Sequence, residues 1–103
     1  YPITTLVSPV SGAIPQTPTF IWTPVDGAAS YRFEVSLFST FYPLYDSADT
    51  FNTKFTPTKI YSNEVVYYWR VAIRDRDGRM GPYTDAVFII GDRFQSYLPI
   101  IVK

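Results

Sequence analysis

The chain has 103 residues, nine acidic and nine basic side chains, and a formal net charge of zero at pH 7. This length suits one domain with an adequate core, and the charge balance argues against a nucleic-acid partner. The sequence contains no Cys and no His. It therefore lacks a thiolate nucleophile, the usual general base and the commonest metal ligand, and we predict no enzymatic activity, no metal site and no cofactor.

The N-terminal third predicts extended segments. Residues 1–10 suit an edge position because Pro cannot donate to a central ladder. Residues 17–23 alternate apolar and polar side chains, which places Phe20 and Trp22 on one face. A turn is expected at residues 24–27, where Asp-Gly tolerates a positive φ.

The middle of the chain predicts three further strands. Residues 30–37 alternate with period two, with the inward face Tyr31, Phe33, Val35 and Leu37 and the outward face Arg32, Glu34 and Ser36. After a turn at 38–43, residues 44–48 form a short edge strand. Residues 50–56 alternate again through Phe51, Thr53 and Phe55.

The C-terminal third contains the clearest strand pattern. Residues 65–74 place Tyr67, Trp69, Val71 and Ile73 on one face. A polar loop is expected at 75–82. A strand follows at 86–90, with Phe88 and Ile90 facing inward.

Seven short strands separated by turns every eight to twelve residues are typical of a β-sandwich. Three stretches carry a family resemblance: PTFIWTPVDGAASYRFEVS at 18–36, YYWRVAIRDRDG at 67–78 and GPYTDAVFII at 81–90. They resemble a fibronectin type III-like domain of bacterial secreted proteins, and immunoglobulin-like sandwiches share much of the pattern. We expect one domain over 1–103, with its core at 5–91 and an extra apolar C-terminal strand or tail at 94–103.

The resemblance implies an all-β, seven-stranded Greek-key sandwich in an extracellular, bacterial protein. It implies that Trp22 is the core tryptophan of the second strand. It also implies that Tyr67 is the corner tyrosine, with its hydroxyl bonded to nearby backbone. The chain begins at Tyr1 without Met, so we expect a processed protein or a fragment of a longer one.

The carboxylates give little support for a metal site or for catalysis. Asp75 and Asp77 have the spacing of a calcium loop, but flanking arginines and the absence of further acidic ligands favour a tight turn at Asp77-Gly78. Asp46 and Asp49 are expected to be solvated residues that protect an edge strand from pairing with other chains.

Aromatic residues are the better lead to a ligand. Phe38, Phe41, Tyr42 and Tyr45 surround the Pro43 turn, and we expect Tyr61, Tyr68 and Tyr83 also to point outward. Exposed rings bind sugars or partner proteins, and they also cover a sandwich against a neighbouring copy. We single out Phe41, Tyr42 and Tyr45 as candidate contacts for a polysaccharide or a protein.

The segment YLPIIV at 97–102 is apolar and strand-prone, yet the seven expected strands end before it. An apolar strand in water promotes aggregation, so three roles are open. It pairs with its own domain's edge, it adds to the edge of another molecule, or it is an export or anchoring signal. The N-terminal arm YPITTLV is also apolar. The assembly candidates are Tyr97, Leu98, Ile100, Ile101 and Val102.

Two functions follow from these features. The first is a structural module that assembles with copies of itself, as a filament or on a surface, or with adjacent domains through its tails. The second is a carbohydrate- or protein-binding accessory module of a secreted multidomain enzyme. No apolar run approaches the ~20 residues of a membrane-spanning helix.

Overall fold

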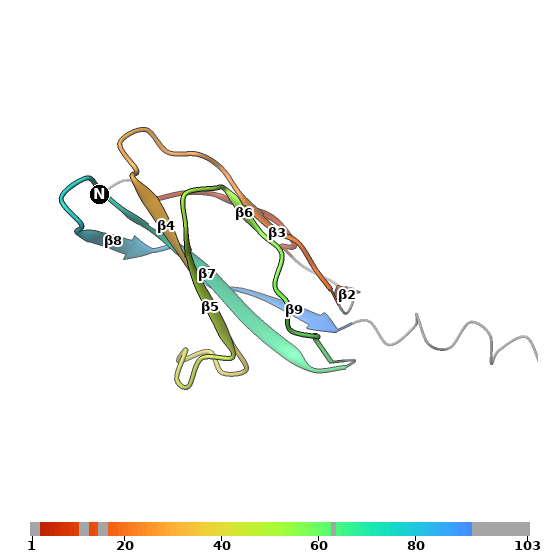
Figure 1. Cartoon of the computed structure of the whole chain (residues 1–103). Coiled ribbons are helices and arrows are strands. Elements are labelled where there is room, and N and C mark those ends of the chain that lie inside the picture. The colour runs from red at the N-terminus through yellow and green to blue at the C-terminus, as the bar shows by residue number, and fades with distance from the viewer. Residues whose placement is uncertain (1–2, 11–12, 15–16, 63, 92–103) are drawn as a thin grey trace, which may run out of the picture.

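Two β-sheets packed face to face form the protein (Figure 1). The structure is a computed structural model that describes residues 3–10, 13–14, 17–62 and 64–91. The smaller sheet has three antiparallel strands in the order β1 (Leu6–Ser8), β3 (Phe20–Trp22) and β6 (Lys54–Phe55).

The larger sheet has six strands. Its order is β2 (Ala13–Ile14), β9 (Val87–Gly91), β7 (Val66–Arg74), β4 (Ser30–Ser36) and β5 (Asp46–Thr50), while β8 (Met80–Tyr83) pairs with the other end of β7. Only the β2–β9 pair is parallel among the described strands.

The chain crosses repeatedly between the two sheets, which confirms the predicted Greek-key sandwich. Strand β5 follows β4 and pairs with it, in register from Tyr31–Thr50 to Val35–Asp46. In a constant-type immunoglobulin domain the corresponding strand joins the opposite sheet. The position of β5 therefore distinguishes this sandwich from that arrangement.

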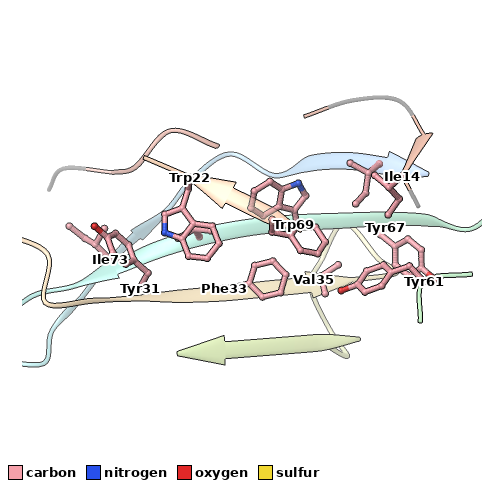
Figure 2. Close-up of a cluster of buried hydrophobic side chains, with 12 residues drawn as sticks. Ile14, Trp22, Tyr31, Phe33, Val35, Tyr61, Tyr67, Trp69 and Ile73 are labelled. Atoms are coloured by element: carbon pink, nitrogen blue, oxygen red, sulfur yellow. The ribbon is translucent and has the colours of Figure 1, made fainter. Parts of the chain in front are cut away.

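Aromatic rings from both sheets fill the core (Figure 2). Trp22 and Trp69 come from opposite sheets, and their ring centroids lie 6.4 Å apart. The Phe20 ring centroid lies 4.7 Å from that of Phe33 and 4.9 Å from that of Trp69. These geometries are tilted, which aromatic pairs prefer to face-to-face stacking. The predicted inward faces of β3 and β7 are confirmed, and so is that of β4 except at Leu37.

Two predicted faces were wrong. Leu37 is exposed because β4 ends at Ser36. Ser36 and Glu34 are buried on the face that was expected to be outward, because the next segments fold over it. In β9 the described core residue is Ile89, which pairs with Tyr67. The side chains of Phe88 and Ile90, which were expected to face inward, lie outside the described part of the structure.

The strand boundaries also differ from the expected ones. Of the strand expected at 50–56, only the two residues of β6 belong to the small sheet. Phe51, which was expected to share a face with Phe55, is 84% exposed. Strand β5 starts two residues later than predicted. Strands β2 and β8 were not predicted at all, and β8 occupies part of the expected 75–82 loop. Such short strands form by pairing with β9 and β7, which local sequence does not reveal.

A tyrosine corner stabilises the connection into β7. The Tyr67 hydroxyl accepts a hydrogen bond of 2.8 Å from the Ser62 backbone N–H, as the resemblance implied. The neighbouring Tyr61 ring lies 4.7 Å away, yet its buried hydroxyl has no hydrogen-bond partner in the described part of the chain. Burial, aided by Asp46, raises the pKa of Tyr61, so this phenol stays protonated.

These two adjacent tyrosines should respond differently to loss of the hydroxyl. Tyr67→Phe removes the acceptor for Ser62 and is expected to lower the free energy of unfolding by about 1–2 kcal/mol. Tyr61→Phe removes an unpaired buried oxygen and is expected to be neutral or stabilising. Urea denaturation of both variants measures the difference. Equal destabilisation would contradict the assigned hydrogen bonding.

Candidate functional site

The outer face of the six-stranded sheet carries a network of charged side chains. Glu34 on β4 lies directly opposite Arg70 on β7 and is 8% exposed. Its Oε1 accepts hydrogen bonds from Arg70 Nε at 3.1 Å and Nη2 at 2.9 Å. Its Oε2 accepts bonds from Arg32 Nε at 3.3 Å and the Tyr83 hydroxyl at 3.0 Å. The buried carboxylate is therefore well compensated.

Asp49 on the edge strand β5 extends the network. It accepts a bond of 3.1 Å from Arg32 Nη1 and forms an ion pair at 3.7 Å with Arg74. Burial lowers the pKa of Arg32, but Asp49 and Glu34 outweigh this and raise the pKa overall. Asp49 thus pairs with two cations on the edge strand β5. Its predicted role in protecting this edge stays a prediction.

The Arg70 guanidinium lies between two aromatic rings. Its central carbon is 4.0 Å from the Phe41 ring centroid and 3.9 Å from the Tyr83 centroid. Burial and the hydrogen bond to Glu34 raise the pKa of Tyr83, so its hydroxyl remains a donor. This cation–π contact holds Phe41, which is only 6% exposed, against the sheet.

Hydrogen bonds fix the β4–β5 loop, residues 37–45, at both ends. The Ser36 hydroxyl donates to the Pro43 carbonyl at 2.8 Å and accepts from the Phe38 N–H at 3.0 Å. Within the loop, the Phe41 N–H donates to the Phe38 carbonyl at 3.0 Å, and Phe41 has a φ of 59°. The loop displays Tyr42, which is 84% exposed.

The predicted exposure of the aromatic residues was wrong at several positions. Phe41 and Tyr61 are buried. Tyr45 is half-buried, with its ring 5.2 Å from both Tyr61 and Tyr67, and its hydroxyl donates to the Ile60 carbonyl at 2.5 Å. The alternation patterns missed these contacts because the loops that bring them together have no period. A binding role for the set Phe41, Tyr42 and Tyr45 stays a prediction.

The Asp75–Arg79 segment is a tight turn, as predicted. Asp75 Oδ1 accepts bonds of 2.9 Å from the N–H groups of Asp77 and Arg79. Gly78 adopts a φ of 84°, which favours glycine. Within the described residues no group of three or more acidic, His or Cys side chains could hold a metal ion.

Exposed apolar side chains gather at one end of the sandwich. They are Leu37, Phe38, Tyr42, Leu44, Ile60 and Val66, and we call them the apolar pole. The strand register places Leu37 and Val66 at this end, because Ser36 pairs with Tyr68 and Val66 pairs with Ile90. Phe38, Tyr42 and Leu44 follow in the β4–β5 loop, and the Ile60 carbonyl accepts a hydrogen bond from Tyr45 of that loop. The end of β9, at Gly91, lies at the same end (Figure 1).

The predicted assembly residues Tyr97, Leu98, Ile100, Ile101 and Val102 lie outside the described residues. In the part of the chain that the structure describes, no helix is long and apolar enough to cross a membrane.

No family model matches the sequence, and no curated protein matches it either. Among solved structures, the fibronectin(III)-like modules of Clostridium thermocellum CbhA match with a TM-score of 0.61 and 16% identity over 87% of this chain and 96% of theirs. An Fn3-like protein from the same organism matches with a TM-score of 0.61 and 21% identity over 88% of each chain.

The fold is fibronectin type III-like. At these identities the likeness shows the fold and no more. The fibronectin type III-like sandwich matches the class predicted from the sequence, with β2 and β8 added to the seven expected strands.

Sequence reasoning missed the network around Glu34. A signal was present, since Arg32 and Glu34 share one face of a predicted strand, and Arg70 and Arg74 share one face of another. The register that sets Glu34 opposite Arg70 could not be read from the alternation, because it depends on how the two strands pair.

We expect Glu34 to matter far more than Asp49 for stability. Glu34→Ala leaves the arginines on the sheet without their buried partner and should lower the free energy of unfolding by about 3 kcal/mol. Asp49→Ala, at a more exposed pair, should cost about 0.5 kcal/mol. Thermal and urea unfolding compare the two variants, and similar losses would contradict the central position of Glu34.

Proposed function

We propose that this chain is a non-catalytic structural module of a bacterial extracellular protein. In this proposal it assembles with copies of itself, or with adjacent domains, by β-strand addition. The fibronectin type III-like fold supports a structural or accessory role, since one of the matching structures is described as fibronectin(III)-like modules of CbhA. The lack of His and Cys supports a role without catalysis.

The acceptor in this proposal is the edge of β1, which pairs only with β3 among the described strands. The β1 edge differs from the edges of β5, β6 and β8 in the features that prevent pairing with another chain. Strand β5 exposes Asp49, and β6 is two residues long and carries Lys54. Strand β8 contains Pro82. Charges, proline and shortness all discourage pairing with another chain. The segment 3–10 around β1 has no charge, and its Ile3, Val7 and Val10 side chains are exposed. Its proline, Pro9, follows the three residues of β1, whereas Pro82 lies within β8.

The donor in this proposal is the segment 97–102, through Tyr97, Leu98, Ile100, Ile101 and Val102. Strand addition supplies main-chain hydrogen bonds for affinity and alternate side chains for specificity. A donor that leaves one molecule and binds another makes a heterologous contact, which produces open filaments when it does not close into a ring.

Deleting residues 94–103 should convert associated protein into monomer, measured by light scattering over a range of concentrations. Val7→Lys places a charge on the proposed acceptor edge and should weaken association as well. Asn52→Lys, on the exposed β5–β6 loop, is the matched control and should associate like the wild type. A wild type that stays monomeric would overturn the proposal.

Exposure of Tyr42 favours a second candidate, a polysaccharide-binding accessory module. The ring is 84% exposed on a loop that hydrogen bonds hold in place. Wild-type protein should then be retained on insoluble polysaccharide and Tyr42→Ala should not. Phe51→Ala removes an equally exposed ring at the other end of β5 and serves as control. No retention of the wild type would remove this candidate.

A further inference from the structure

We propose that the apolar pole of one copy packs against the next copy, beside the strand that the next copy accepts. This inference rests on the proposed function and adds a second contact to the same interface. It assigns a partner, a second copy of this chain, to Leu37, Phe38, Tyr42, Leu44, Ile60 and Val66.

The side chains of the pole are exposed and add little to the packing of the core. Exposure of Tyr42, Phe38 and Leu37 leaves their apolar surface in water, where it contributes little to folding. The loop beneath them is held by Ser36 and by the stacking of Phe41 on Arg70. A prearranged loop loses little conformational freedom on binding, which favours association.

The composition of the pole fits a protein surface better than a sugar. Aliphatic side chains outnumber aromatic rings in it, and only the rings can stack on a sugar face. The sequence from Val35 to Tyr45 contains no charged residue. The Lys59 ammonium lies at the edge of this loop, where it donates to the Tyr45 carbonyl and lies over the Tyr45 ring. A neutral, apolar partner therefore meets no charged side chain from residues 37–44 themselves.

The position of the pole selects the next copy as that partner. The described sandwich ends at Gly91, at the same end as the pole. Six residue-to-residue steps lead from Gly91 to Tyr97, the first donor residue, and six extended steps span at most about 22 Å. A copy that accepts residues 97–102 must therefore place its β1 edge within roughly that distance of Gly91. Strands β7 and β4 lie between β9 and β5, at about 5 Å per step, so the pole falls within the same range.

The acceptor region supplies a matching surface. Ile3, Val7 and Val10 are exposed along the uncharged segment 3–10. Contact between this segment on one copy and the pole on another would bury apolar side chains on both. Because the two surfaces differ, an assembly of any length still offers a free pole at one end and a free β1 edge at the other.

Analytical ultracentrifugation of four proteins tests this inference: the full chain, the 94–103 deletion, Phe38→Ser with Tyr42→Ser, and Phe51→Ser. The pole double variant should raise the dissociation constant by at least about tenfold. Phe51→Ser, as exposed as Tyr42 but at the other end of β5, should associate like the wild type. Ile60→Ser, on a different loop of the pole, should weaken association in the same direction.

The outcomes separate the two proposals. If the deletion is monomeric and the pole variants associate like the wild type, the pole contact is wrong and strand addition stands. If the pole variants are monomeric and the deletion still associates, strand addition is wrong and the pole contact stands. If Phe51→Ser weakens association as much as the pole variants, the pole has no special part and the inference is overturned. A monomeric wild type overturns both.

Discussion

The packing of Trp69 between the two sheets is the interaction on which the rest of the structure depends. Its ring contacts Phe20 and Trp22 of the small sheet and Phe33 of its own sheet. Its Nε1 also donates to the Pro9 carbonyl at 2.8 Å, which ties the segment after β1 to the core. One side chain thus links both sheets and the N-terminal segment, and its own strand β7 pairs with β4. The charged network is built on the face of the larger sheet away from Trp69.

Sequence periodicity was sufficient to predict the inward side chains wherever a strand has one buried and one solvated face. The inward faces of β3 and β7 followed from alternation alone, and the turn at Gly78 followed from the Asp77-Gly78 pair. Prediction failed where loops fold back over a sheet. Glu34 and Ser36 are buried because Arg70, Tyr83 and the β4–β5 loop cover them, and no local pattern encodes a contact between segments 36 or 49 residues apart. The same limit applies to Phe41, whose burial requires Arg70.

The contrast between the two kinds of surface supports a role in assembly. The charged face satisfies its own groups internally, with Glu34 and Asp49 shared among three arginines. The β1 edge and the apolar pole leave neutral and apolar groups available to a partner. A surface that is internally satisfied has little to gain from binding, while exposed apolar side chains gain from leaving water. The arrangement thus favours the edge and the pole, and not the charged face, as sites of contact.

Site-specific cross-linking tests the central claim most directly, because the chain has no Cys of its own. Val7→Cys protein mixed with Ile100→Cys protein should form a disulfide-linked heterodimer in excess over either homodimer, because the proposed strand addition brings position 100 of one copy beside β1 of another. A mixture of Phe51→Cys and Ile100→Cys proteins gives the background level. Heterodimer yields that do not exceed this background would contradict strand addition at β1.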